Sequence, residues 1–424
     1  MRGFTKLEKS WMMYDWGSSA FSVIITTAIF PIYYKAQASS AGVSGALSTA
    51  YLGYTISIFT FILAILGPIL GTIADYKGLK KKFFLVFMGM GVISTFSLLF
   101  VPEGAWLPLL ILFTFASLGS TGANVFYDAF LVDVTTDKKM NDVSARGYGL
   151  GYIGSSIPFV ISIAIILMSQ QGSLPLSSTT ASKIAFLITC VWWGVFAIPM
   201  IRRVNQVHYI ERDTQLIRKS FQRLWKTIRH VKDYKYVTLF LIAYFFYIDG
   251  VGTIISMSTA YGTDVGLNAS VLLLVLLMTQ IVAAPFSVLY GRLADRFSAK
   301  SMLFVGIFVY IIVCIYGFFL ETAFDFWVLA MLVASSQGGI QALSRSYFAK
   351  LIPKNHANEF FGFYNIFGKF ASITGPFLLG ITAQLTGRSN MGILSLIFLF
   401  IIGAIVLYFV PSDKENLASI KPKA

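Results

Sequence analysis

Long apolar stretches alternate with short polar loops along nearly the whole chain. A membrane-spanning helix needs about 20 mostly apolar residues, and the sequence contains a series of runs of this length. The runs cover residues 12–34, 47–73, 83–101, 107–131, 146–169, 183–201, 236–260, 270–291, 301–320, 326–348, 360–385 and 391–410. The first run continues past Pro31, so it is too long for a cleaved signal peptide. The pattern predicts an all-α integral membrane protein with twelve transmembrane helices.

The composition supports this prediction and excludes other classes of protein. Of the 424 residues, 56% are hydrophobic and 12% are charged, against about 25% charged in an ordinary soluble domain. The mean hydropathy is +0.74. So few charges cannot cover the surface of a soluble protein of this length. Water-soluble enzymes, nucleic-acid binders and disordered scaffolds are therefore poor interpretations.

The positive charges lie mostly on one side of the predicted membrane. With alternate loops assigned to opposite sides, one side holds both termini and the long middle loop together with Lys77, Lys80, Lys81, Lys82, Lys138, Lys139, Arg146, Arg292, Arg296, Lys300, Lys350 and Lys354. The other side holds Lys35, Lys183 and Arg388. The positive-inside rule then places both termini in the cytosol. It also explains the net charge of +14 without a nucleic-acid partner.

The long middle loop divides the chain into three parts. We expect an N-terminal half over residues 1–201, a linker over 202–235 and a C-terminal half over 236–424. In the linker, apolar residues from Ile217 to Val231 recur at helical spacing between basic residues. This pattern favours an amphipathic helix on anionic lipid at the cytosolic surface. A helix packed against the ends of the bundle is the alternative.

The two predicted halves repeat one another. Corresponding residues lie about 215 to 220 positions apart, as expected when a six-helix unit occurs twice. The matched pairs are Gly71 with Gly291, Asp75 with Asp295, Asn124 with Gln341, Asp128 with Arg345, and Gly147 with Gly362. Two related halves favour a transporter whose substrate path runs between them.

The loop after the second span carries a recognisable motif. Its residues Gly71, Asp75, Gly78, Lys80 and Lys81, echoed by Gly291, Asp295 and Arg296, resemble the signature of the major facilitator superfamily. The resemblance implies a latch that closes the cytosolic side, and a fold of two pseudo-symmetric six-helix halves.

Each motif residue has a physical role in this interpretation. A glycine at 71 would let two helices approach closely, and Asp75 can accept hydrogen bonds at a neighbouring helix N-terminus. The fourth span lacks the arginine that often partners this aspartate, which leaves the partner of Asp75 open. A charge cluster that only fixes the orientation of the chain is the alternative.

A narrower resemblance rests on four segments. Tyr14–Phe21, Phe126–Leu131, Arg146–Tyr152 and Gln337–Ser346 are similar to the vacuole-effluxer-like branch, the autophagy-linked amino-acid exporters and their bacterial relatives. The branch implies export of amino acids or similar small metabolites. It also implies a bacterial plasma membrane or, in a eukaryote, a vacuolar or lysosomal membrane.

Ionisable residues inside the predicted spans are candidates for function, because a charge in a membrane is costly. Asp15 lies in the first span, where capping of the helix start is the alternative. Asp128 and Arg345 occupy corresponding positions and form a predicted pair across the central path, with a purely structural salt bridge as the alternative. Asp249 has no basic neighbour in sequence and is a candidate proton site. Lys369 is a candidate for binding an anionic group, with snorkelling to the surface as the alternative.

Uncharged polar groups complete the predicted path. They are Asn124, Tyr127, Tyr148, Tyr152, Gln341 and Asn365. Such a mixture suits a small zwitterion, and equally a peptide, a nucleoside or an amphiphilic drug. Gly149, Gly151 and Gly154 match a dinucleotide-binding pattern, but no strand precedes them. Small residues four apart, such as Gly147 and Gly151, instead favour tight helix packing.

The sequence as a whole predicts a monomeric secondary transporter without a cofactor or metal. Its expected partners are a small-molecule substrate, protons, and anionic lipids at the linker, with no nucleic acid. Export of amino acids by alternating access, driven by protons, is the favoured function. An exporter of drugs or lipid-like amphiphiles is the alternative, as is a membrane receptor or scaffold that does not transport. A catalytic constellation is absent from the sequence, so an enzyme is not expected.

Overall fold

The computed structural model describes residues 3–211, 220, 222, 234–264, 269–320, 322–386 and 389–413. Helices make up most of this part of the chain. They are α1 (Lys6–Ala20), η1 (Phe21–Ala28), α2 (Ile29–Ser40), α3 (Gly45–Ala74), α4 (Lys80–Ser97), η2 (Leu98–Phe100), α5 (Trp106–Ala129), α6 (Leu131–Val134), α7 (Met140–Gln170), α8 (Ser178–Arg203), α10 (Lys235–Asp264), α11 (Ala269–Arg296), α12 (Ala299–Phe318), α13 (Ala323–Leu351), η4 (Lys354–His356), α14 (Ala357–Thr386), α15 (Ser389–Ser395) and α16 (Ile397–Tyr408).

The helices confirm the predicted fold class. Each predicted run coincides with a helix or with consecutive helical segments, and most of the helices begin before the predicted run does. Within the described residues, 11 helices are long and apolar enough to span a membrane. The helix at the position of the remaining run, 360–385, is α14, which has 30 residues. At 1.5 Å per residue its length also suffices to cross a bilayer.

The first span is not a uniform α-helix. Thr5 and Glu8 form a capping box at its start, and Phe21–Ala28 then form a π-helix before α2 begins. Pro31 lies in the first turn of α2 and cannot donate a backbone hydrogen bond there. Short π-helical segments in long helices often occur at functional sites.

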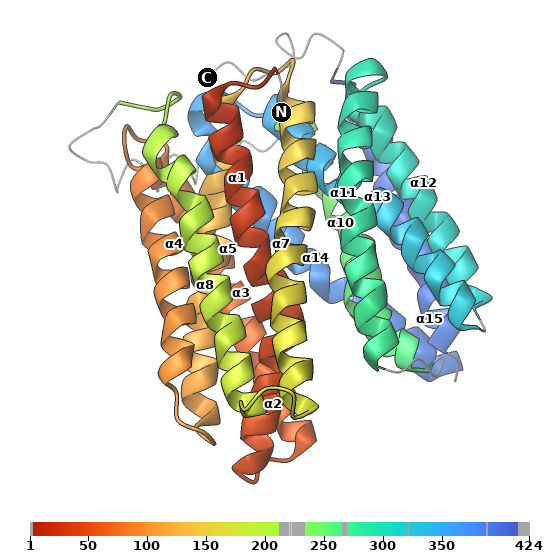
Figure 1. Cartoon of the computed structure of the whole chain (residues 1–424). Coiled ribbons are helices and arrows are strands. Elements are labelled where there is room, and N and C mark those ends of the chain that lie inside the picture. The colour runs from red at the N-terminus through yellow and green to blue at the C-terminus, as the bar shows by residue number, and fades with distance from the viewer. Residues whose placement is uncertain are drawn as a thin grey trace.

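Helices α1–α8 form the N-terminal half and α10–α16 the C-terminal half (Figure 1). Both ends of the described chain lie at one end of the bundle, which we call the terminal face. The halves contact each other where α3 crosses α14 and where α7 crosses α11 and α13. The ribbons of the two halves meet toward the terminal face and diverge at the opposite end (Figure 1). The arrangement is therefore closed at the terminal face.

The beginning of the linker binds the turn between α3 and α4. The backbone of Ile210 pairs with that of Asp75 and Lys77, and the Gln206 side chain accepts a hydrogen bond from the Gly78 N–H. Gly78 has a φ of +74°, a conformation that favours glycine in a tight turn. The predicted amphipathic helix from Ile217 to Val231 falls almost entirely outside the described residues.

Candidate functional site

A buried ion cluster joins the two halves near the ends of α5 and α13 that lie toward the terminal face. Arg345 of α13 donates hydrogen bonds from Nη1 to Asp128 Oδ1 at 3.1 Å and from Nη2 to Asp15 Oδ2 at 3.3 Å. Its Nε donates to Ser144 Oγ at 2.9 Å, and Nη2 also donates to the Ser144 carbonyl oxygen at 3.0 Å. The arginine is 2% exposed. One cation of the C-terminal half thus bridges α1, α5 and α7 of the N-terminal half.

The cluster both confirms and extends the pairing expected from the repeat. Asp128 and Arg345 form an ion pair, and Asp15 is a second acid on the same guanidinium. The capping interpretation of Asp15 is wrong, because Thr5 caps α1 and Asp15 lies more than two turns further along the helix. Sequence spacing could not show that Asp15 joins the pair, since this contact depends on how α1 packs against α7.

Aromatic rings surround the guanidinium. Its Cζ lies 4.6 Å from the ring centre of Trp11, 4.4 Å from that of Tyr148 and 5.6 Å from that of Tyr127. The rings of Trp11 and Tyr127 stack at 4.5 Å, and Trp11 Nε1 donates to the Tyr127 carbonyl oxygen. Such rings attract a cation through their quadrupoles. Sequence reasoning included Tyr127 and Tyr148 but missed Trp11, which lies one helical turn before Asp15.

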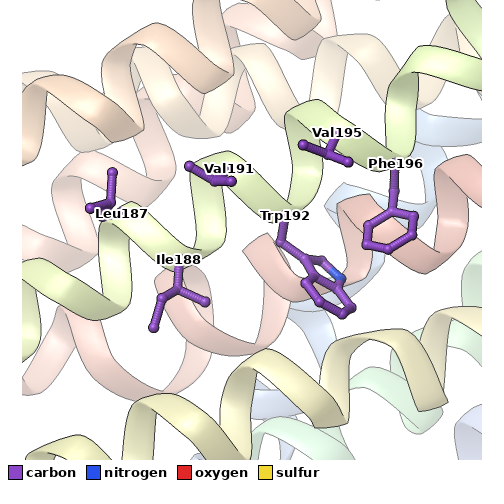
Figure 2. A pocket seen from close by; sticks show the side chains of 6 residues that line it. All are labelled: Leu187, Ile188, Val191, Trp192, Val195 and Phe196. Carbon is purple, nitrogen blue, oxygen red and sulfur yellow. The ribbon is translucent and has the colours of Figure 1, made fainter.

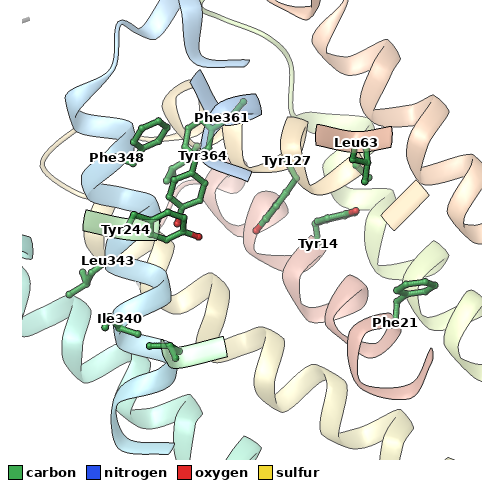
Figure 3. Close-up of a cluster of buried hydrophobic side chains, with 14 of the residues drawn as sticks. Tyr14, Phe21, Leu63, Tyr127, Tyr244, Ile340, Leu343, Phe348, Phe361 and Tyr364 are labelled. Carbon is green, nitrogen blue, oxygen red and sulfur yellow. The ribbon is translucent and has the colours of Figure 1, made fainter. Parts of the chain in front are cut away.

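Buried aromatic residues extend from this site into the C-terminal half. Figure 3 shows a group of buried side chains in which Tyr14 and Tyr127 lie on one side and Tyr244, Tyr364 and Phe361 on the other. The Tyr244 and Tyr364 rings stack at 4.3 Å. The region between the halves is thus aromatic around a charged centre.

The glycines of α7 allow this close packing. A Cβ at Gly147 would lie 2.6 Å from Asp15 Oδ2 and 3.1 Å from Arg345 Nη2. A Cβ at Gly151 would lie 2.5 Å from Ser19 Oγ, and Gly154 packs against Trp16 of the same helix α1. The helix-packing interpretation of these small residues is therefore confirmed. The glycines lie inside a helix, which is not the strand-to-helix turn of a dinucleotide site.

The other residues of the predicted path take different positions. Asn365 of α14 lies beside Asp128 and lines a small cavity with Thr121 and Gly67. Tyr152 packs against α13, because a Cβ at Gly338 would lie 2.7 Å from its ring. Asn124 of α5 and Gln341 of α13 are half-buried. The side chain of Lys369 lies outside the described side chains, so its predicted role stays a prediction.

Asp249 lies apart from the ion cluster, within the C-terminal half. It is fully buried in α10. Its Oδ1 accepts hydrogen bonds from the Gly375 backbone N–H at 2.8 Å and from Thr253 Oγ1 at 3.5 Å. Gly375 precedes Pro376 in α14. The carboxyl group therefore connects α10 with α14 through a backbone donor, without a cation among the hydrogen-bond and ion-pair partners that the structure gives it.

The motif aspartate Asp75 caps a helix of the opposite half. Its Oδ1 accepts hydrogen bonds from the Asn358 backbone N–H at 2.9 Å and from Asn358 Nδ2 at 2.8 Å. Asn358 lies in the first turn of α14, where free N–H groups favour an anion. A Cβ at Gly71 would lie 2.9 Å from the Asn358 carbonyl carbon and 3.2 Å from Glu359 Cα. Both predicted contacts of the motif are present, and a partner of Asp75 is Asn358.

The second copy of the motif makes the corresponding contact with the roles of the halves exchanged: the C-terminal half supplies the aspartate, and the N-terminal half supplies the helix start. Asn141, in the first turn of α7, donates from Nδ2 to Asp295 Oδ1 at 3.3 Å. A Cβ at Gly291 would lie 2.5 Å from the Ala145 Cβ. Arg296 is exposed. Sequence reasoning missed Asn141 and Asn358, although they are separated by the same interval as Asp128 and Arg345.

The motif lysines make their contacts within the N-terminal half and with the start of the linker. Lys80 is fully buried and donates from Nζ to Asp133 Oδ2 at 2.7 Å and to the Ala129 carbonyl oxygen at 3.1 Å. Asp133 Oδ1 also accepts from the backbone N–H groups of Val207 and His208. Lys81 donates to Asn205 Oδ1 at 2.8 Å. These lysines therefore attach the start of the linker to α4 and α6, and they do more than fix the orientation of the chain.

The acceptor role of Asp75 predicts a selective loss in the Asp75→Asn variant. The variant should be produced and folded, because an asparagine has nearly the same volume. Its transport should fall about two- to thirty-fold, since an anion at a helix N-terminus contributes about 0.3–2 kcal/mol to the closed state. The measurement is flux in proteoliposomes. Asp295→Asn is the matched control and should lose less, because Asp295 accepts the longer contact. Wild-type flux in Asp75→Asn would contradict the prediction.

One group of described residues has the spacing of possible metal ligands. Asp75, His356 and Glu359 place one ligand atom each within 4.8 Å of one another. The hydrogen bonds from Asn358 already occupy Asp75 Oδ1. We therefore describe these residues as part of the contact between α3 and α14.

A groove lies along α8, where Leu187, Val191 and Val195 are exposed. It has a volume of about 460 Å³ and is lined by Leu187, Ile188, Val191, Trp192, Val195 and Phe196 (Figure 2). Every one of these side chains is apolar apart from the indole N–H of Trp192, which donates to the Trp16 carbonyl oxygen at 3.3 Å. The groove offers no free polar group to orient a solute, so it is not the candidate site.

Comparison with known proteins shows the family of the chain. The model of the family described as vacuole effluxer Atg22-like matches residues 5–418. The chain is 62% identical to the uncharacterized MFS-type transporter YxiO of Bacillus subtilis, over 98% of this chain and 97% of that protein. It is 23% identical to autophagy-related protein 22 of Eremothecium gossypii, over 94% and 89% of the two chains.

Solved structures share the fold. The proton:xylose symporter XylE of the major facilitator superfamily superposes with a TM-score of 0.73 at 13% identity, over 98% of both chains. FucP, solved in its outward conformation, superposes with a TM-score of 0.67 at 11% identity, over 97% and 99% of the two chains. The family match, which covers nearly the whole chain, and this shared fold lead to one conclusion: the chain belongs to the Atg22-like vacuole effluxer family, within the major facilitator superfamily of transporters.

Proposed function

We propose that this transporter exports a small metabolite, with amino acids favoured, by rocking its two halves around the ion cluster. In this proposal the terminal face is the cytosolic face, as the excess of basic residues there suggests. The arrangement is then the outward-facing state. The N-terminal and C-terminal halves follow the boundaries 1–201 and 236–424, joined by a lipid-binding linker, and the protein acts as a monomer.

The observation that carries the proposal is Arg345 bridging the halves at Asp15 and Asp128. A buried charge cluster is expensive to keep, so a purely structural scaffold has little reason to retain it. Opening the terminal face has to separate Arg345 from both acids, together with Asp75 from Asn358. In this proposal, the binding of a solute compensates for the loss of these contacts when the terminal face opens, as alternating access requires.

Proton coupling is assigned to Asp249. Its carboxyl group is fully buried, and its hydrogen-bond donor is a backbone N–H next to the Gly375–Pro376 irregularity of α14. A proline inside a helix weakens the local hydrogen bonding and permits bending. A change in the protonation of Asp249 would therefore act directly on the part of α14 that can bend.

The Asp249→Asn variant tests this assignment, because asparagine mimics the protonated acid and keeps an acceptor for Gly375. We expect the variant to lose accumulation of amino acids driven by a pH gradient, and to keep exchange down a concentration gradient. The measurement is flux of a radiolabelled amino-acid mixture in proteoliposomes, with and without an imposed pH gradient. Accumulation at the wild-type level would assign coupling to another acid, Asp15 or Asp128.

Export of an amphiphilic drug is the second candidate, and the aromatic lining between the halves favours it. A thermal-shift screen of the purified protein separates the two, because a ligand raises the stability of the folded state by RT ln(1 + [L]/Kd). Amino acids should stabilise the protein if the first proposal holds, and amphiphilic cations if the second does. A receptor that does not transport would show binding without flux.

A further inference from the structure

Arg345 is held by the N-terminal half in the way that a protein holds a bound ligand. Among the described residues, its four hydrogen bonds go to Asp15, Asp128 and Ser144. The three rings that surround it, those of Trp11, Tyr127 and Tyr148, also belong to that half. We call these six residues the cation box. Arg345 is the one residue that the C-terminal half contributes to this set of contacts.

The box is built by contacts within the N-terminal half. Trp11 is fixed by stacking on Tyr127 and by its hydrogen bond to the Tyr127 carbonyl oxygen. Gly147 lets α7 approach α1 so closely that Asp15 lies directly over the glycine. These contacts lie within the N-terminal half, whereas Ser144 Oγ also donates to the Ala342 carbonyl oxygen of α13 and Asn365 of α14 lies beside Asp128. The stacked rings and the close approach of α7 to α1 therefore hold Trp11, Tyr127 and Asp15 in place when Arg345 leaves.

The charges of the box make it a site for a cation. Two carboxyl groups face one guanidinium group, so the departure of Arg345 would leave two buried acids without their cation. Leaving a buried charge unpaired is strongly unfavourable. An external cation that reaches the box after the halves separate is therefore favoured there.

From this geometry we infer that the cation box binds a primary ammonium or guanidinium group of the substrate, which takes the place of Arg345 when the terminal face opens. This inference rests on the proposed function and names a substrate class for it. Arg345 then acts as an internal competitor: it fills the box while the terminal face is closed and is displaced in the other state.

The shape of the box sets an order of preference among cations. A guanidinium group can lie within 5 Å of the centres of the Trp11 and Tyr148 rings and donate to both acids, as Arg345 does. A primary ammonium can also donate to the acids, but it lacks the flat face that stacks on aromatic rings. A quaternary ammonium can approach the rings but has no N–H group for the carboxylates. We therefore expect methylguanidinium to bind better than ethylammonium, and both to bind better than tetramethylammonium.

Chemical rescue of the Arg345→Ala variant tests the inference. We expect about 10 mM methylguanidinium to raise its Tm by about 2 °C or more, with a smaller rise for ethylammonium. Tetramethylammonium should have no more effect than sodium chloride at the same ionic strength. The wild-type protein should show no such shift, because Arg345 already fills the box. Arg146→Ala is the matched control: this arginine pairs with Asp142 at the partly exposed start of α7, so its loss leaves no enclosed box.

A second variant covers the case in which Arg345→Ala does not fold. Arg345→Ala/Asp128→Asn removes one of the two acids and should show the same order of cations with smaller shifts. If methylguanidinium stabilises neither variant more than sodium chloride does, the inference is overturned. The assay measures binding alone, so it is independent of flux. If the cations rescue the variant but the wild-type protein shows no transport, the proposed function is refuted and the cation box is supported. If the wild-type protein transports but no cation rescues the variant, the cation box is refuted.

Discussion

Arg345→Ala is expected to destabilise the protein more than Asp128→Asn. Loss of the arginine leaves the carboxylates of Asp15 and Asp128 buried together without a cation, a change that costs about 3–5 kcal/mol. Asp128→Asn leaves Arg345 paired with Asp15, and the loss should be about 1.5–3 kcal/mol, the range for one hydrogen bond to a charged group. Thermal unfolding of the purified variants in detergent measures the difference.

The double variant provides the control for this prediction. Arg345→Ala/Asp128→Asn should be more stable than Arg345→Ala alone, because one of the two unpaired acids has gone. It should remain less stable than Asp128→Asn, because Asp15 still lacks its partner. A strictly additive loss in the double variant would show that Arg345 and Asp128 do not interact in the folded protein.

Gly71→Leu is expected to abolish most transport while leaving the halves folded. Any Cβ at position 71 meets the backbone of Asn358 and Glu359 in α14, and backbone atoms cannot move aside as a flexible side chain can. Overpacking of this kind costs about 1–3 kcal/mol. Because this cost falls on the closed state alone, it shifts the equilibrium away from that state about 5- to 150-fold.

Cysteine labelling measures this shift directly. Ser346 is fully buried, and its Oγ donates to Asn141 Oδ1 in the closed arrangement. In a Ser346→Cys background, Gly71→Leu should raise the rate of labelling by a polar maleimide about tenfold, within the range of that shift. Gly89→Leu is the matched control, since a Cβ at Gly89 meets nothing within 4 Å. Equal labelling in the two leucine variants would contradict the steric argument.

The two predictions concern different layers of the same closed arrangement. Asp75 and Asp295 connect the halves at the ends of α3 and α11, and Arg345 connects them deeper in the bundle. The outer layer uses hydrogen bonds to helix N-termini, which water can replace easily. The inner layer uses ionised groups, which need another charge to replace them. We therefore expect the outer layer to set the balance between access states, and the inner layer to respond to the substrate.

The sequence by itself determined the class of the protein and the positions of its spans. Apolar runs of about 20 residues have one stable solution in a membrane, because a helix satisfies all of its own backbone hydrogen bonds there. The repeat was also visible in the sequence. The intervals between Gly71 and Gly291 and between Asp128 and Arg345 are 220 and 217 residues, and intervals this similar survive in a chain whose two halves keep similar helix lengths. The acceptor role of Asp75 followed from the chemistry of helix ends.

Only the tertiary structure decided which residues meet around Arg345. Trp11 and Asp15 lie some 330 residues before it in sequence, and their contact depends on how α1, α7 and α13 pack in three dimensions. Gly147 makes this packing possible, and its effect depends on the distance of closest approach between helices, which no sequence interval records. Asn141 and Asn358 remained unnoticed because an asparagine in the first turn of a helix is common. Their role depends on the aspartate that the opposite half brings to each of them.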